Sequence, residues 1–298
     1  YRKFRNLYQN RVHRGPRLSV YIYHQDKDNV LDYNMKSGDG GYWLRFMGLK
    51  YFLDGALGSQ TAWLQKAYEN SNSLGIQLWK KDDIRKELTD IRNNNTIKVA
   101  IHAIGDAAFD EALDLFENSN FYNDIPDRIE HGQLCNEEIL EKLKNRKLGI
   151  CTNPSHLLSD FPTAEKYWGE RSRYAFALKS LEKSGQIITM GSDAPVESIN
   201  PWLGIMAAVY RVPQYSGIPW YAEECISLES ALKMNTYNPA ILSGEKNKKG
   251  LLMPGYLADL FVCSKDPFNA EMADMQSIRS LLTIIDGQVV YNRLSNLI

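Results

Sequence analysis

Four residues of types that bind metal ions or move protons are each associated with a separate strand-like run of apolar residues. They are Lys50, His102, His131 and Asp193. Two neutral imidazoles and a carboxylate suit Zn²⁺ and leave positions open for water and substrate. A metal ion can activate water as hydroxide at neutral pH, and a nearby carboxylate can pass a proton to a leaving group. Together these residues predict metal-dependent hydrolysis.

Each of the four residues also has an ordinary structural interpretation. His102 alone fits a buried core histidine, and Asp193 alone fits the cap of the helix that follows it. Lys50 alone fits a lysine whose stem lies on apolar surface while its ammonium reaches water. A buried lysine with a lowered pKa is instead neutral and nucleophilic, and CO₂ can convert it into an oxygen ligand for two cations.

Three stretches share the order strand, polar residue, turn and helix. They are Val99–Phe116, Arg128–Lys147 and Ile187–Tyr210. His102 and His131 lie 29 residues apart, which is close to the length of one β-α-β unit. Polar residues at the carboxyl ends of successive parallel strands are where (β/α)₈ barrels hold their chemistry. The repeated order therefore predicts an α/β protein with a parallel sheet.

The remaining chain has weaker signals. Strands are expected at Leu18–Tyr23 and Leu148–Asn153. Helices are expected at Asp82–Asn93 and at Leu228–Leu242, the second broken near Tyr237–Pro239. Pro154–Asp160 is expected to be a loop that carries His156.

The chain changes character near Gly250, where strand-like runs replace the helical ones. An Asp286-Gly287 pair between alternating apolar residues predicts a β-hairpin. We therefore expect two units, a partial hydrolase barrel over residues 1–249 and a β segment over residues 250–298.

Composition excludes several classes of function. The 298 residues carry a net charge of −1, which argues against nucleic-acid partners. We find no apolar run near the roughly 18 residues that a membrane span needs. The four cysteines form no CxxC pair or disulfide framework, which favours a cytoplasmic location. The chain begins with Tyr1 rather than Met, so a targeting segment could have been removed.

Five runs resemble the amidohydrolase superfamily, and more narrowly its metal-dependent hydrolase branch, which contains N-substituted formamide deformylase. They are LKYFLDGALGSQTA, VAIHAIGDAAFDEAL, RIEHGQL, ITMGSDAPVESINPWLGIMAAVYR and GLLMPGYLADLFV. The resemblance extends from about Gly41 to the C-terminus. It implies an α/β (β/α)₈ TIM barrel with one or two Zn²⁺ or other divalent ions. It also implies cleavage of a C–N bond in a small amide-like molecule.

The same resemblance implies roles for the four residues. Lys50 would be a carboxylated lysine that bridges two metal ions, and His102 and His131 would be the histidine ligands of the fifth and sixth strands. Asp193 would be both a ligand and the group that shuttles the proton. Six further residues are expected to support the ligands or orient substrate, with local hydrogen bonding or, for His156, a surface position as the alternative. They are Asp54, Asp106, Glu130, Gln133, His156 and Arg211.

The chain departs from the family pattern at its start. It contains no His-x-His pair, which the family places on the first barrel strand, and no N-terminal β segment to pair with the strands after Gly250. We therefore expect the C-terminal portion of a longer enzyme, without about two or three barrel strands and half of the small sandwich. Exposed edges would then be covered by a missing N-terminal segment, another chain or a second copy in a homo-oligomer.

The absent pair leaves other functions open. The chain could be a non-catalytic remnant or an assembly subunit that needs a partner segment to complete the barrel. A mononuclear deaminase of the same superfamily fits less well, because it too would normally use a His-x-His pair and because Lys50 would have no role. We expect the isolated chain to bind one Zn²⁺ weakly and to hydrolyse little.

Overall fold

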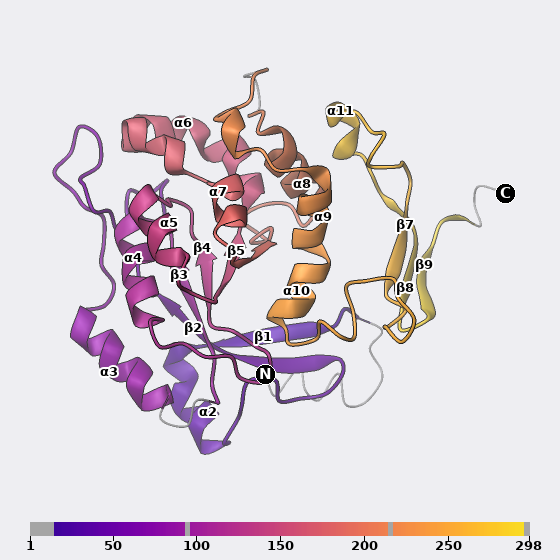
Figure 1. Ribbon diagram of the computed structural model, residues 1–298, viewed down its shortest axis with the longest axis horizontal. Coiled ribbons are helices and arrows are strands. Elements are labelled where there is room, and N and C mark those ends of the chain that lie inside the picture. The colour runs from indigo at the N-terminus through magenta and orange to yellow at the C-terminus, as the bar shows by residue number, and fades with distance from the viewer. Residues whose placement is uncertain (1–14, 93–95, 214–216, 295–298) are drawn as a thin grey trace.

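Six parallel strands form the centre of the computed structural model, which describes residues 15–92, 96–213 and 217–294 (Figure 1). The strands are β1 (Leu18–Tyr23), β2 (Leu44–Phe52), β3 (Val99–Ala103), β4 (Arg128–His131), β5 (Gly149–Thr152) and β6 (Ile187–Met190). They are hydrogen-bonded in sequence order, each parallel to the next. Helical crossovers between successive strands produce this arrangement, because parallel strands cannot be joined by tight turns.

Helices cover the sheet on its outer side. The α-helices are α2 (Lys27–Asp32), α3 (Lys81–Arg92), α4 (Asp106–Leu115), α5 (Glu137–Leu143), α6 (Leu157–Trp168), α7 (Leu178–Lys183), α8 (Pro201–Tyr210), α9 (Leu228–Asn235), α10 (Tyr237–Leu242) and α11 (Met272–Met275). The 3₁₀ helices are η1 (His24–Asp26), η2 (Pro154–His156), η3 (Gly169–Tyr174) and η4 (Ala222–Glu224). In Figure 1, α9 and α10 stand between the parallel sheet and the C-terminal strands, and both contact β6.

The two faces of the parallel sheet differ in chemistry. Ile101 and Ile129 are register partners and belong to the buried core that the sheet forms with the helices. His102, Glu130 and Cys151 are partners in the next row and lie on the opposite face. Side chains alternate along a strand, so the apolar residues point toward the helices and the polar residues lie on the other face. We call this other face of the parallel sheet its inner face.

The C-terminal residues form a separate antiparallel sheet. Its strands are β7 (Leu260–Cys263), β8 (Ser280–Ile285) and β9 (Gln288–Asn292). The predicted hairpin is confirmed, since β8 and β9 pair across Asp286 and Gly287. A cavity of about 760 Å³ lies between this sheet, α10 and the inner face of the parallel sheet, with Arg128, Cys151 and Thr189 among its lining residues.

The predicted α/β class with a parallel sheet is confirmed. In the described residues the sheet is open, because β1 pairs with β2 and β6 with β5 but β1 and β6 do not pair with each other. Closure into an eight-stranded barrel therefore stays a prediction. Residues 1–14, at the start of the first predicted unit, lie outside the described residues. No helix in the described ranges is long and apolar enough to cross a membrane.

The prediction of a loop at Pro154–Asp160 is wrong. The segment forms η2 and the first turn of α6, which continues to Trp168. The buried residues Leu157, Ala164 and Trp168 define one face of α6, which packs into a second apolar cluster. Pro162 inside α6 hides this periodicity in the sequence, because proline normally ends a helix.

Candidate functional site

Side chains from three neighbouring strands and η2 form one continuous group. Lys50 Nζ lies 4.9 Å from the centroid of the Phe52 ring, and the Phe52 and His102 ring centroids are 4.9 Å apart. The His102 and His131 rings meet edge to face at 4.5 Å, and the His131 and His156 centroids are 6.3 Å apart. The structure thus brings together Lys50, His102 and His131, and it places His156 beside them.

Local backbone geometry brings His131 into this group. Strand alternation and the pairing of His102 with Glu130 would place His131 on the opposite face from His102. At His131, however, the backbone enters the left-handed region with φ of 70°, and Gly132 follows with φ of 52°. This turn ends β4 and accounts for the contact between the His131 and His102 rings.

Asp193 follows β6, which lies two strands away from β4, the strand that ends at His131. β6 ends at Met190, three residues before Asp193, so the predicted strand is shorter than expected. The Asp193 backbone is also left-handed, with φ of 53°, and its side chain is exposed. The Asp193 carboxylate interacts electrostatically with Lys50 and acts to raise the pKa of that lysine.

Burial keeps the two strand-end histidines neutral. It lowers the pKa of His102 to about 4, and it lowers the pKa of His131 well below the ordinary value. The neighbouring Lys50 cation also lowers both pKa values. Neutral imidazole is the form that binds metal ions.

Burial and the neighbouring charges have partly opposing effects on the pKa of Lys50. Burial lowers its pKa from 10.5 to about 8, and the carboxylate of Glu130 acts in the opposite direction. Glu130 is itself held below its ordinary pKa by the cations Arg128 and Lys50, although burial acts to raise it. Glu130 forms an ion pair with Arg128 and lies in the same row as Cys151. A share of Lys50 is therefore neutral near pH 8.

Replacing Lys50 with methionine is expected to change how stability depends on pH. Because the pKa is about 8 in the folded chain and 10.5 when unfolded, the unfolded state binds more protons between these values. The free energy of unfolding of the wild type should therefore rise through this window by about 3 kcal/mol more than that of Lys50→Met. Urea unfolding of both proteins from pH 7.5 to 10.5 measures the difference. Parallel curves would show that Lys50 is not desolvated.

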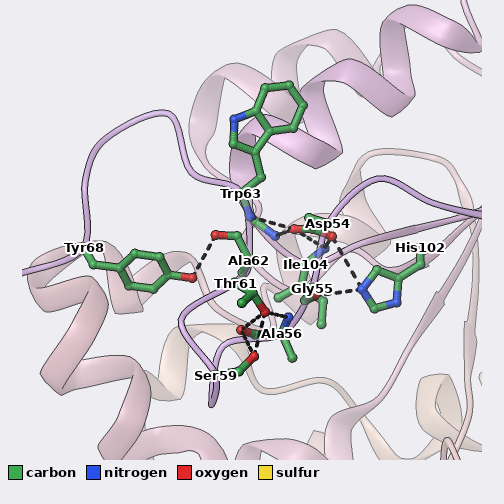
Figure 2. A network of polar contacts seen from close by, with 11 residues as sticks. Asp54, Gly55, Ala56, Ser59, Thr61, Ala62, Trp63, Tyr68, His102 and Ile104 are labelled. Atoms are coloured by element: carbon green, nitrogen blue, oxygen red, sulfur yellow. Dashed lines mark hydrogen bonds and ion pairs between the residues drawn. The ribbon is translucent and has the colours of Figure 1, made fainter. Parts of the chain in front are cut away.

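The residues predicted to assist the group divide into two sets. Asp54 lies 3.5 Å from the His102 ring and holds the loop after β2 (Figure 2). Asp106 lies at the start of α4, where its Oδ1 accepts a hydrogen bond from the Gln65 backbone N–H at 2.9 Å. Asp54 therefore contacts a member of the group, whereas the bonds of Asp106 organise a neighbouring loop.

A polar region lies next to His131. Gln133 donates from Nε2 to Asp160 Oδ2 at 3.0 Å. His156 Nε2 and Ser155 Oγ are buried and make no hydrogen bond within the described ranges. Buried polar atoms without partners are uncommon, and at functional sites a ligand or water often satisfies them. This region is therefore able to accept a hydrogen-bonding group of a small molecule.

Arg211 makes its hydrogen bonds to the main chain. The residue is fully buried at the C-terminus of α8, with φ of 49°. It donates from Nε to Trp220 O at 2.8 Å, and its other nitrogens donate to Phe176 O at 2.7 Å and Ala175 O at 3.3 Å. These bonds connect three segments of the chain. They correspond to local hydrogen bonding, the alternative to substrate contact in the sequence analysis.

The donor set for a metal ion is partial. Among the residues that the structure describes, no group of three His, Cys, Asp or Glu side chains is arranged to hold a metal ion. His102 and His131 supply two neutral imidazoles, and His131 Nδ1 is buried without a hydrogen bond of normal geometry in the same ranges. Lys50 is the third member of the group, and its amine is not a metal ligand unless it is neutral or modified.

Sequence reasoning missed two residues of this arrangement. Phe52 lies between Lys50 and His102, and its position two residues after Lys50 on one strand could have placed it on the same face. The carbonyl of Gly55 accepts from His102 Nε2 at 2.8 Å, and no side-chain pattern reveals such a contact.

The chain matches known proteins along most of its length. The model of the family described as "Amidohydrolase family" matches residues 6–291. The chain is 31% identical to the protein YtcJ of Bacillus subtilis over 281 residues, covering 93% of this chain and 52% of YtcJ. It is 26% identical to N-substituted formamide deformylase of Arthrobacter pascens over 259 residues, covering 85% of this chain and 47% of that enzyme.

The chain also resembles a solved structure along most of its length. An uncharacterized metal-dependent hydrolase from Pyrococcus horikoshii superposes with a TM-score of 0.75 at 30% identity, covering 86% of this chain and 52% of that chain. The chain thus spans about half the length of the curated relatives that it matches.

Proposed function

The chain belongs to the amidohydrolase family, as the motif resemblance predicted, and from this premise we propose that it serves metal-dependent hydrolysis of a C–N bond in an amide-like small molecule. The observation that carries the proposal is the convergence of Lys50, His102 and His131, whose side chains are linked through ring contacts at the ends of three adjacent strands. The names of the similar proteins, a metal-dependent hydrolase and a formamide deformylase, support the same class.

The residues present fit a divalent metal ion as a partial set of ligands. His102 and His131 would hold it as neutral imidazoles, with Lys50, when carboxylated, and Asp193 as oxygen donors. Zn²⁺ is our proposed ion because it accepts nitrogen and oxygen ligands with open positions. When bound, the ion polarises the substrate carbonyl and activates water.

The chain's own residues would bind substrate and move protons. Asp193 would accept the proton of the attacking water and return it to the departing nitrogen, because its carboxylate is exposed and interacts electrostatically with Lys50. Ser155 and His156 would hydrogen-bond the substrate through atoms that are otherwise unpaired within the described ranges. Phe52 would shield one side of the centre from water.

Metal analysis combined with an amide panel tests this function. The protein is incubated with Zn²⁺ or Mn²⁺, and amine release is measured from N-substituted formamides, N-acyl amines and cyclic ureides. We expect about one weakly bound ion per chain and, for at least one amide, a low rate of hydrolysis that stops after chelation and in His102→Asn. Two tightly bound ions would contradict the expected partial site. A metal-loaded protein that cleaves no amide would contradict the proposed reaction.

A second candidate follows from the partial ligand set. The absence of a three-ligand His, Cys, Asp or Glu group in the described ranges favours a non-catalytic subunit that needs a partner segment or a second copy. A protein that stays metal-free at saturating Zn²⁺ and elutes as a dimer or a complex in size-exclusion chromatography would favour this candidate over the hydrolase.

A further inference from the structure

One buried carboxylate closes the loop that follows β2. Asp54 Oδ1 accepts a hydrogen bond from the backbone N–H of Ile104 at 3.0 Å. Asp54 Oδ2 accepts from the backbone N–H groups of Gly105 at 2.8 Å and Trp63 at 2.9 Å. The residue therefore ties the end of β2 to the end of β3 and to the far side of the loop (Figure 2).

The residue after Asp54 contacts a candidate metal ligand. His102 Nε2 lies 2.8 Å from the carbonyl oxygen of Gly55 and 3.5 Å from Asp54 Oδ1. A carbonyl oxygen can only accept a hydrogen bond, so Nε2 must carry the proton. In a neutral imidazole the lone pair then lies on Nδ1, the ring nitrogen that does not face Gly55.

The loop has little freedom to move this carbonyl. Gly55 donates its N–H to Thr61 O at 3.1 Å, and Ala56 donates its N–H to Thr61 Oγ1 at 2.9 Å. A Cβ atom at Gly55 would lie 2.0 Å from Thr61 Oγ1, and one at Gly105 would lie 1.9 Å from Trp63 O. Close packing of Gly55 against the Thr61 side chain, and of Gly105 against the Trp63 backbone, thus holds the Gly55 carbonyl where Asp54 places it.

We propose that Asp54 is a positioning residue that fixes His102 as the Nε2–H tautomer, so that Nδ1 is the atom offered to the centre shared with Lys50 and His131. The inference rests on the proposed metal-dependent function, and it identifies Asp54 as the residue that orients the ligand His102. Groups outside the ligand shell commonly orient a metal-binding histidine in this way, and their loss costs about 10–100-fold in metal affinity.

The wild-type tautomer gives the first test. The metal-free protein is labelled with ¹³C and ¹⁵N at its five histidines, and His102→Asn identifies the His102 signals by their loss. At pH 7.5 we expect the ring ¹⁵N and ¹³Cδ2 shifts of the Nε2–H tautomer. Shifts of the Nδ1–H tautomer would overturn the proposal and would leave the proposed hydrolysis untouched.

Asp54→Asn gives the second test. We expect a mixed His102 tautomer and a 10–100-fold loss of Zn²⁺ affinity, measured by competition with a chromophoric chelator. Asp127→Asn is the matched control, because Asp127 is equally buried and accepts from the Val99 N–H at 2.7 Å at the opposite end of β3. The control should lose stability but keep the wild-type tautomer and affinity.

The outcomes separate the two proposals. An unchanged tautomer and affinity in Asp54→Asn, or equal changes in both variants, would overturn the role of Asp54. If Asp54→Asn does not fold, Asp54→Ser, which keeps one acceptor oxygen, replaces it with the same expectations. A wild type with the Nε2–H tautomer that binds no Zn²⁺ would instead contradict the proposed metal-dependent function.

Discussion

Replacing Asp193 with asparagine is expected to lower kcat for amide hydrolysis by about 10²–10⁴-fold, because the variant keeps the shape of the side chain but cannot accept a proton. Asparagine also tolerates the left-handed backbone at this position, where φ is 53°. Steady-state kinetics on the best amide of the panel measures the effect. The metal content, measured in parallel, separates lost proton transfer from lost ligation.

Asp124→Asn is the control for this experiment. Asp124 is exposed and left-handed with φ of 62°, and it pairs with Lys246 at 3.7 Å rather than with the Lys50 group. It should leave kcat within a factor of about two, as expected of a surface substitution. A kcat of Asp193→Asn that also stays near wild type would assign proton transfer to another group.

Replacing Arg211 with methionine is expected to destabilise the fold by about 3 kcal/mol or more, because each buried carbonyl left without a donor costs about 1–3 kcal/mol. The carbonyls of Ala175 and Trp220 lose this donor, whereas Phe176 O keeps a hydrogen bond from the Leu178 N–H at 2.7 Å. Part of this loss is offset, since a buried guanidinium no longer has to be desolvated; burial already lowers its pKa to about 10. Urea unfolding measures the free-energy difference.

Arg171 offers a matched comparison. It donates to the carbonyls of Lys66 and Ala67 at 2.7 Å each and to Trp168 O at 3.2 Å, but it is only partly buried. Water can replace its bonds, so Arg171→Met should cost less than half as much as Arg211→Met. If Arg211→Met instead keeps wild-type stability and raises KM, the arginine contacts substrate and is not mainly a structural clamp.

Much of the fold follows from local sequence patterns. β1 at Leu18–Tyr23 has the predicted bounds, because a β-branched and aromatic run defines the strand. The helix α8 ends at Tyr210, as the predicted stretch does, and Asn200 with Pro201 defines its start. The Asp286-Gly287 pair determines the C-terminal hairpin for a similar local reason. Alternation of strands and helices then requires a parallel sheet.

The sequence also placed the candidate residues at strand ends. An apolar run that stops at a polar residue marks the carboxyl end of a buried strand, and parallel neighbours bring such ends to one edge. His102 and Asp54 both lie at this edge in the structure. The sequence alone could not decide whether Asp54 contacts a ligand or closes a loop, because both need the same carboxylate.

Only the tertiary structure decided which side chains meet. Strand alternation alone would place Glu130, and not His131, beside His102, and the left-handed turn at His131 reverses this expectation. The contact between His102 and the Gly55 carbonyl depends on backbone atoms brought together across 47 positions of the chain. Such contacts arise from the path of the loops and the packing of the sheet, whereas sequence periodicity reports only which face of an element is apolar.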